Sequence, residues 1–313
     1  MGAAGAGACG DILEGILLMA AQKEKVSVIL PTFNRAYVLE RAIRSVLAQS
    51  YENLELIVAD DGSTDGTSSL VAAVKDERVR YVRTEKNRGA AGARNYGLQC
   101  ATGVFVAFQD SDDYWRPEKL RLQVEELEKE QAGFCYHKVQ YDFGEGQIVV
   151  LPQEHIPLEQ KCGDIYAQLL HENMVDCPAL LVRRECLEEV GAFDEGLSAL
   201  EDYDLALRLG NAFYAAFVNQ VLVDKSYTEG SVSLQAEHYL DASCRILFRY
   251  WKDYLATGNF DHRVGRILED AQKAGRHAHY LELLMKRVDE EQKTGSGGGA
   301  GILRDEEREK EGG

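Results

Sequence analysis

The sequence predicts an α/β fold in which a mostly parallel central sheet is flanked by helices and followed by a C-terminal helical region. Two observations predict it. Hydrophobic residues alternate between a strand period and a helix period along most of the chain, and clusters of polar residues follow the predicted strands. The composition is ordinary for such a fold, because 45% of the 313 residues are hydrophobic and 28% are charged.

The first half of the chain supplies the parallel part of the sheet. Short apolar runs predict strands over 26–30, 54–59, 79–82 and 104–108, and helix-periodic segments between them predict helices over 37–49, 67–74 and 91–100. Strands joined by crossover helices run parallel and are covered on both faces, which explains why they are apolar throughout. Functional sites in such sheets form beyond the carboxyl ends of the strands.

The second half is less regular. A charged amphipathic helix is expected from Pro117 to about Gln131, followed by strands over 134–141 and 148–151 with a Gly144-Glu145-Gly146 hairpin signal. Apolar segments over 165–170 and 179–182 and a helix over 201–209 continue the α/β pattern, and helices over 239–255, 263–274 and 278–288 end it.

This pattern predicts four regions. Residues 25–233 form one α/β domain and residues 234–288 a C-terminal helical region. Residues 1–24 and 289–313 are expected to be flexible tails, because both contain glycine-rich runs.

The charge excludes some functions. The chain has 52 acidic and 35 basic residues, so its formal net charge is -17, which argues against partners such as nucleic acid that require a basic face. Its seven cysteines are scattered singly and are expected to be reduced thiols. Because no apolar run is long enough for a membrane anchor or a secretion signal, a cytoplasmic protein is expected.

Three acidic clusters follow predicted strands or begin a helix, and each has two interpretations. Asp110-Ser111-Asp112-Asp113 favours a divalent cation held between crowded carboxylates, although Asp112 or Asp113 could instead cap a helix. The segment from Asp60 to Thr67 is a turn with capping oxygens, or a site where Asp60 or Asp61 accepts a hydrogen bond from a nucleobase or ribose. Glu201-Asp202-Tyr203-Asp204 is an ordinary acidic first turn, or places Asp202 as a general base.

A fourth cluster joins the third strand to the third helix. Asn87-Arg88-Gly89 and Ala93-Arg94-Asn95 combine small residues with two arginines, which favours phosphate at a helix N-terminus. The segment has neither the order of a P-loop nor that of a dinucleotide-binding fingerprint, so neither chemistry is supported.

Taken together and in this order, the motifs resemble those of the family 2 glycosyltransferases, which have the GT-A fold. The resemblance covers roughly residues 25 to 233. The motifs that carry it are Pro31-Thr32-Phe33-Asn34-Arg35, the segment from Asp60 to Thr67, Asn87-Arg88-Gly89 with Ala93-Arg94-Asn95, Asp110-Ser111-Asp112-Asp113, and Glu201-Asp202-Tyr203.

The resemblance implies a role for each motif. The residues expected to bind the nucleotide-sugar donor are Pro31, Phe33, Arg35, Asp60, Asp61, Arg88, Arg94, Asp110 and Asp112. Asp110 and Asp112 match the D-x-D element, and Asp112 and Asp113 would hold Mn²⁺ or Mg²⁺ against the diphosphate. Asp202 matches the catalytic base, so the transfer is expected to invert the anomeric carbon.

One departure lies downstream. Many relatives carry a histidine in an H-x-x-S-x-S-like stretch, whereas residues 227–233 contain the serines without that histidine. In relatives this histidine often aids the metal or the diphosphate, so the departure bears on metal affinity and on activity.

The leading hypothesis is an inverting, metal-assisted transferase that moves a sugar, preferably from a UDP-sugar, to a saccharide or glycoconjugate acceptor in envelope polysaccharide assembly. The alternatives are transfer onto a polyprenyl phosphate and a nucleotide-sugar-binding scaffold without turnover. The expected partners are the donor and the acceptor, while a homo-oligomer and a peripheral position at the inner face of the membrane stay open.

Overall fold

The structure is a computed structural model that describes residues 24–144, 146–226 and 236–293. Within these residues the chain divides into two compact units. Unit 1 contains the described residues up to Tyr166, residues 173–196 and residues 201–226. Unit 2 contains residues 167–172, residues 197–200 and the helices from residue 236 onward. The boundary predicted between residues 233 and 234 lies outside the described residues.

Unit 1 is built on a sheet that has nine strands over the described residues, in the order β3-β2-β1-β4-β8-β6-β9-β5 with β7 paired to β6. The strands are β1 (Val26–Thr32), β2 (Leu54–Asp60), β3 (Val79–Arg83), β4 (Phe105–Phe108), β5 (Tyr114–Trp115), β6 (Phe134–Asp142), β7 (Ile148–Leu151), β8 (Leu181–Arg183) and β9 (Ala215–Ser226). The predicted strands are all present, and β5 and β9 are additional.

The sheet is parallel in its first half and mixed in its second. The strands β1 to β4 pair only in parallel with one another. In contrast, β8 is antiparallel to β4 and β6, β5 is antiparallel to β9, and β6 and β9 are parallel. The strands β6 and β7 are joined by a tight turn, which only antiparallel strands allow.

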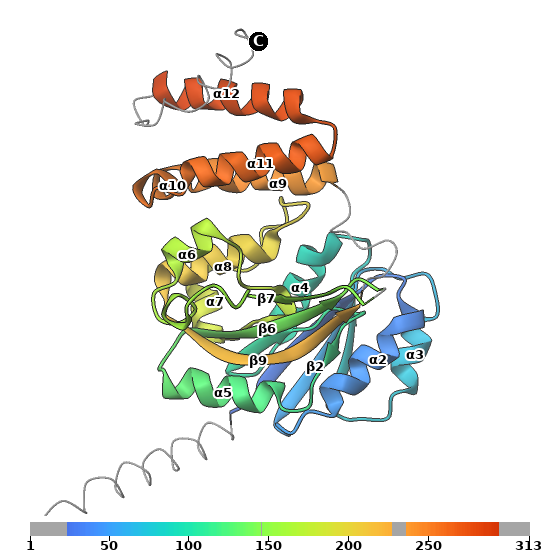
Figure 1. Cartoon of the computed structure of the whole chain (residues 1–313). Helices are drawn as coiled ribbons and strands as arrows, with labels where there is room; N and C mark the ends of the chain where they lie inside the picture. Colours follow the sequence, from blue (N-terminus) through green and yellow to red (C-terminus); the bar gives the residue numbers. More distant parts are fainter. Residues whose placement is uncertain (1–23, 145, 227–235, 294–313) are drawn as a thin grey trace, which may run out of the picture. The chain divides into compact units, whose positions relative to one another are not determined.

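Helices cover this sheet. They are α2 (Ala36–Leu47), α3 (Thr67–Ala73), α4 (Gly89–Cys100), α5 (Lys119–Lys129), α7 (Arg184–Val190) and α8 (Glu201–Ala212). The helix α6 (Tyr166–His171) lies almost wholly in unit 2. Figure 1 shows α4 and α5 on opposite sides of the sheet, where α4 packs on β1 and β2 and α5 on β6 and β9. The helix α4 lies so close to β1 that a Cβ atom at Gly97 would come within 2.6 Å of Ile29 Cγ2.

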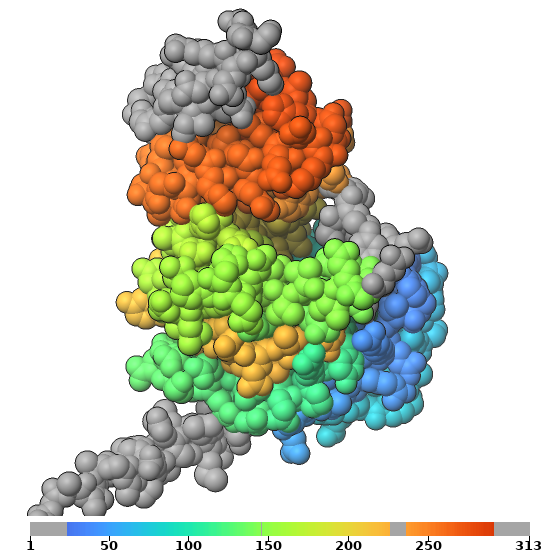
Figure 2. Space-filling model, in the orientation of Figure 1, coloured from blue at the N-terminus to red at the C-terminus, as the bar shows by residue number. Residues whose placement is uncertain are grey.

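Unit 2 has a helical core of its own. Its helices are α9 (Ala236–Arg249), α10 (Trp251–Ala256), α11 (Phe260–Lys273) and α12 (His277–Lys293), and Figure 2 shows them in orange and red as one continuous block. The Trp251 ring lies edge-on to Phe260 with a centroid distance of 4.4 Å and stacks on Phe248 at 5.5 Å. The residues Leu197 and Ala199 pack with Ala242 of α9.

Two helix boundaries in unit 2 differ from the prediction. The single helix expected over 239–255 is divided at Tyr250 into α9 and α10. The last helix continues to Lys293, into the range expected to be a tail. None of the helices that the structure describes combines the length and the apolar composition needed to cross a membrane.

Candidate active site

Polar loops follow β1 and β2 at the same edge of the sheet. The register places Thr32 beside Asp60 at the ends of these two strands. The two loops are then tied together, because the Asn34 backbone amide donates to Ser63 Oγ at 2.8 Å and the Thr64 amide donates to Asn34 Oδ1 at 2.7 Å. Asn34 has a left-handed backbone with φ of 53°, which asparagine tolerates better than most residues.

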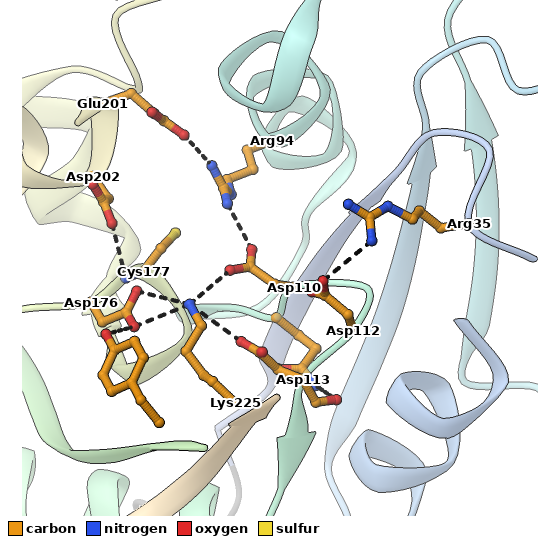
Figure 3. Close-up of polar contacts among 12 residues, drawn as sticks. Arg35, Arg94, Asp110, Asp112, Asp113, Asp176, Cys177, Glu201, Asp202 and Lys225 are labelled. Carbon is orange, nitrogen blue, oxygen red and sulfur yellow. Dashed lines mark hydrogen bonds and ion pairs between the residues drawn. The ribbon is translucent and has the colours of Figure 1, made fainter. Parts of the chain in front are cut away.

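The first predicted donor-binding motif brackets this loop. Pro31 is buried as part of β1, and the Phe33 side chain is exposed at 43%. Arg35 lies just before α2, and its Nη1 atom is 3.4 Å from Asp112 Oδ2 (Figure 3). The structure therefore places the motif that follows β1 beside Asp112, in the acidic motif that follows β4.

Asp60 and Asp61 are buried and hold backbone in place. The carboxylate of Asp60 accepts hydrogen bonds from the Ser63 amide at 2.8 Å and from the Tyr81 hydroxyl. The carboxylate of Asp61 accepts hydrogen bonds from the backbone amides of Arg88 and Gly89 at 2.8 to 2.9 Å, where α4 begins. Both residues therefore hold the backbone of the loops that follow β2 and β3. Their contact with a donor stays a prediction.

Arg94 links three parts of the site. It is buried in α4, and its guanidinium donates to Asp110 Oδ1 and to Glu201 Oε1, each at 2.7 Å. It also lies over the Phe193 ring, 5.4 Å from the centroid. A planar guanidinium with several fixed donors can hold two carboxylates in one geometry, so Arg94 connects the end of β4 to the start of α8.

Arg88 has a different environment from Arg94. Its Nη2 atom donates to both carboxylate oxygens of Glu195 at 2.8 and 2.9 Å, and its side chain is 39% exposed. Glu195 also accepts a hydrogen bond from Asn95 Nδ2 at 3.0 Å. The two arginines predicted to bind the diphosphate therefore differ. Arg94 is buried between acidic residues, whereas Arg88 pairs with Glu195 and is partly exposed.

Four acidic residues and one lysine form the centre of the site (Figure 3). We call them the acidic cluster: Asp110, Asp112, Asp113, Asp176 and Lys225. The Lys225 Nζ atom lies 3.1 Å from Asp176 Oδ2, 3.4 Å from Asp110 Oδ2 and 3.5 Å from Asp113 Oδ2. The Tyr141 hydroxyl donates to Asp176.

Their surroundings shift the pKa values of two carboxyl groups of the acidic cluster in opposite directions. Burial opposes ionisation of Asp110, but the charges of Arg94 and Lys225 outweigh it and lower the pKa of Asp110 to about 2. Burial raises the pKa of Asp113 well above its usual range, and the neighbouring carboxylates Asp110 and Asp176 add to the effect despite Lys225. Asp110 is therefore a permanent anion beside a carboxyl group that resists ionisation.

Asp202 lies at the start of α8, where the sequence predicts a general base. Its carboxylate accepts hydrogen bonds from the Tyr203 amide at 2.8 Å and from the Cys177 amide at 3.3 Å. Burial, together with the charges of Glu201 and Asp176, raises the pKa of Asp202 to about 7. A carboxylate with this pKa can accept a proton near neutral pH, which suits a general base.

Three site residues were not predicted from the sequence: Tyr141, Asp176 and Lys225. They come from β6, from the segment before β8 and from β9, where no motif marks them. Only Asp176 carries a local signal, because it is a polar residue within the otherwise apolar run Met174-Val175-Asp176-Cys177-Pro178. Tyr141 and Lys225 lie beside other polar residues near the ends of β6 and β9. The residues 227–233, whose sequence lacks the family's histidine, lie outside the described part of the chain.

The donor atoms in the acidic cluster fit a small divalent cation. Carboxylate oxygens are the ligands that Mg²⁺ and Mn²⁺ prefer, and Mg²⁺ is commonly bound by one or two carboxylates plus substrate phosphates. The buried Asp113 Oδ2 atom accepts no hydrogen bond within the described residues. No group of three or more His, Cys, Asp or Glu side chains placed to hold a metal occurs among these residues.

Comparisons with known proteins identify the family of this chain. The model of the family described as Glycosyl transferase family 2 matches residues 27–191. The succinoglycan biosynthesis protein ExoO of Rhizobium meliloti is 34% identical over 265 residues, which cover 79% of this chain and 74% of ExoO. The fold is that of a GT-A glycosyltransferase.

The chain belongs to glycosyl transferase family 2. It is also 43% identical over 111 residues to the UDP-Glc:alpha-D-GlcNAc-diphosphoundecaprenol beta-1,3-glucosyltransferase WfgD of Escherichia coli, over 36% of this chain and 44% of WfgD. The chain therefore matches less than half the length of that relative.

Among solved structures, the mannosyltransferase PcManGT from Pyrobaculum calidifontis, in complex with GDP-Man and Mn²⁺, superimposes with a TM-score of 0.60 at 20% identity. The match covers 90% of this chain and 89% of PcManGT. The predicted α/β class with the GT-A fold is thus confirmed, as is the prediction that the chain is a glycosyltransferase.

Proposed function

We propose that this glycosyltransferase moves a sugar from a UDP-sugar to a saccharide or glycoconjugate acceptor with inversion of the anomeric carbon, and that Asp202 is the general base. The observation that carries the proposal is the Asp202 carboxylate, whose pKa is raised to about 7. Its neighbour in sequence, Glu201, is bonded through Arg94 to Asp110 in the motif that follows β4. A family 2 transferase needs a base at one side of the sugar and positive charge at the other.

The proposed reaction is a single displacement. The acceptor oxygen forms a bond to the anomeric carbon while the bond between that carbon and the diphosphate oxygen breaks, and Asp202 takes the proton of the acceptor hydroxyl. Attack opposite the departing group inverts the configuration. Arg35 and Arg94 orient the carboxylates of Asp112 and Asp110, which follow β4. Pro31, Phe33, Asp60, Asp61 and Arg88 shape the donor side. Mn²⁺ or Mg²⁺ held by Asp112 and Asp113 would neutralise the charge that develops on the departing nucleoside diphosphate.

The names of the relatives support the choice of substrates. WfgD takes UDP-Glc and an acceptor on diphosphoundecaprenol, and ExoO acts in succinoglycan biosynthesis. PcManGT was solved with GDP-Man and Mn²⁺, which supports a divalent metal while leaving a second nucleotide to be tested. We therefore propose an acceptor saccharide in envelope polysaccharide assembly, carried on a polyprenyl diphosphate, and a working position at the cytoplasmic face of the membrane.

A donor panel tests this function. The full chain is incubated with UDP-Glc, UDP-GlcNAc or GDP-Man and Mn²⁺, with and without lipid-linked saccharide acceptors, and release of nucleoside diphosphate is measured. We expect release with a UDP-sugar, stimulated by acceptor and reduced by EDTA. Transfer onto polyprenyl phosphate alone would move the assignment to the alternative acceptor class, and donor binding without turnover on any acceptor would show a binding protein.

The metal assignment has its own test. Asp112→Asn should lose the Mn²⁺-dependent part of UDP binding, because it removes one of the two carboxylates assigned to the cation. Asp224→Asn is the matched control, since Asp224 pairs with Arg116 and has no assigned role in the site. If Asp112→Asn keeps the parent's Mn²⁺ stimulation of UDP binding, the metal assignment is wrong.

A further inference from the structure

Phe143 carries an exposed aromatic ring directly after β6. The residue is 46% exposed, and its backbone amide donates to the Gln147 carbonyl at 3.0 Å in the turn that joins β6 to β7. Gly144 and Gly146, with φ of 82° and 81°, permit this tight turn. A single exposed apolar side chain is ordinary on a protein surface, so what matters is how the ring is held and what lies beside it.

The Phe143 ring is held by Tyr141. Side chains two positions apart along a strand point to the same face, and these two rings are nearly parallel, with 10° between their planes and 6.2 Å between their centroids. Tyr141 is fixed in turn, because its hydroxyl donates to Asp176 and its ring centroid lies 5.7 Å from Lys225 Nζ. The exposed ring is therefore supported by a half-buried ring that belongs to the site.

The same contacts connect this ring pair, Tyr141 and Phe143, to the proposed base. Asp176 accepts the hydrogen bond of the Tyr141 hydroxyl, and the amide of the next residue, Cys177, donates to Asp202 Oδ2 at 3.3 Å (Figure 3). The ring pair therefore lies on the Asp202 side of the site.

The strand order separates the ring pair from the donor motifs. The strands β8 and β6 lie on one side of β4, whereas β1 and β2, which lead into the motifs with Arg35, Asp60 and Asp61, lie on the other. In a displacement with inversion, the acceptor approaches opposite to the departing diphosphate, and its hydroxyl must reach the base. The surface beside the base and away from the donor motifs is therefore where the acceptor is expected.

An exposed aromatic face suits a saccharide. The face of an aromatic ring carries partial negative charge and a large apolar area, while one face of a pyranose presents C–H groups with partial positive charge. The two faces pack flat on each other and leave the hydroxyl groups at the edge of the sugar free. Because Tyr141 and the turn already hold the Phe143 ring, little conformational freedom is lost when a sugar binds.

We propose that Phe143, supported by Tyr141, is an acceptor-binding residue whose exposed ring face packs against a sugar ring of the acceptor, so that a hydroxyl of the saccharide reaches Asp202. This inference rests on the proposed function, because it assumes that the Asp202 side receives a saccharide. The part of the acceptor that Phe143 recognises is the sugar rather than the lipid chain. The ring pair makes no donor contact, so donor binding should not depend on it.

Steady-state kinetics of the full chain test the proposal, with UDP-Glc as donor and α-D-GlcNAc-diphosphoundecaprenol as acceptor. Phe143→Ala should raise the KM for the acceptor at least about tenfold and leave kcat within about twofold, because it removes apolar contact made equally before and during the reaction. Its UDP affinity by calorimetry should stay within about twofold of the parent. A KM for the acceptor within about twofold of the parent's would overturn the proposal.

Three further variants separate an aromatic contact from other effects. Phe143→Tyr keeps the ring and should stay within about threefold of the parent's KM for the acceptor, whereas Phe143→Leu should stay at least about threefold above it. Tyr214→Ala is the matched control and should leave KM unchanged, since Tyr214 is 66% exposed and precedes β9 at the opposite end of its pairing with β6. Equal KM values for the Tyr and Leu variants would show that no aromatic face is recognised, and would overturn the proposal.

An acceptor with a methyl group in place of the undecaprenyl chain distinguishes the sugar from the lipid. Phe143→Ala should weaken the use of both acceptors by about the same factor. A loss confined to the undecaprenyl acceptor would show that Phe143 contacts the lipid chain or the membrane, and would overturn the proposal.

Saturation-transfer NMR with the methyl acceptor measures the contact without turnover. We expect transfer from aromatic protons of the parent to the C–H protons of GlcNAc, and its loss in Phe143→Ala while UDP binding is retained. A parent that releases no nucleoside diphosphate from any donor would overturn the proposed function, and the NMR measurement would still decide the role of Phe143. The absence of transfer in the parent, or unchanged transfer in Phe143→Ala, would overturn the proposal.

Discussion

The carboxylates on the two sides of the crevice are held in different ways. After β2, Asp60 and Asp61 are buried but accept hydrogen bonds from backbone amides, and Asp61 caps the start of α4. On the other side, Asp113 and Asp202 lie near further carboxylates, and their pKa values are raised. The first arrangement stabilises loops, whereas the second keeps carboxyl groups ready to change protonation or to bind a cation.

Arg94 joins the segment after β4 to the start of α8, and removing it should have the largest effect on stability. Arg94→Met leaves Asp110 and Glu201 without the buried cation that holds both, so the free energy of unfolding should fall by about 3 to 5 kcal/mol. Arg88→Met, which breaks the more exposed pair with Glu195, should cost less than about 1 kcal/mol. Urea denaturation of both variants measures the difference, and equal losses would show that Arg94 is no more than a surface pair.

The pH dependence of kcat should follow the protonation of Asp202. Because the pKa of Asp202 is about 7, its base form is lost as the pH falls through 7, and kcat should drop about tenfold per pH unit below that value. A kcat profile that stays flat from pH 5 to 8 would contradict the assignment of Asp202.

Replacing the two kinds of carboxylate should change the free energy of unfolding differently. Asp61→Asn should lower the free energy of unfolding by about 1 to 2 kcal/mol, because it weakens the cap of α4. The pKa of Asp202 is raised in the folded state, so its contribution to stability is present below about pH 4 and is lost as the pH rises to about 7. Asp202→Asn should therefore be at least as stable as the parent at pH 8.

Thermal unfolding of Asp61→Asn and Asp202→Asn at pH 8 gives this comparison directly. Asp164→Asn is a useful control, because Asp164 accepts a backbone hydrogen bond at the start of α6 and has no role in the site. If Asp202→Asn is less stable than Asp61→Asn at pH 8, Asp202 is a structural cap and the contrast between the two sides fails.

The same contrast explains what could be predicted from the sequence. The parallel half of the sheet follows from apolar runs and helix periods, and its polar residues come in motifs directly after each strand, so Arg35, Asp112 and Arg94 were predicted from local pattern. Asp176 and Lys225 could not be predicted, because neither belongs to a motif that follows a strand of the parallel half. Their role depends on the pairing of β9 with β6. This pairing joins residues far apart in the sequence, so the local pattern of hydrophobic residues does not predict it.

The roles of Asp60 and Asp61 show a second limit of sequence patterns. An acidic pair after a strand is equally typical of a ligand site and of a turn that caps a helix. The structure shows that both carboxylates accept hydrogen bonds from the protein itself. Residue type and spacing predict which loops carry the polar residues, but the hydrogen-bond partners of each carboxylate required the folded chain.

Turnover of Asp202→Asn decides whether Asp202 is the base of an inverting sugar transfer. It is measured with the best donor and acceptor from the panel, alongside UDP affinity and the anomeric configuration of the parent's product by NMR. We expect a kcat lower by about 10²- to 10⁴-fold, a UDP affinity within about twofold of the parent, and an inverted product. Transfer by Asp202→Asn at the parent's rate, or a product with retained configuration, would contradict this assignment.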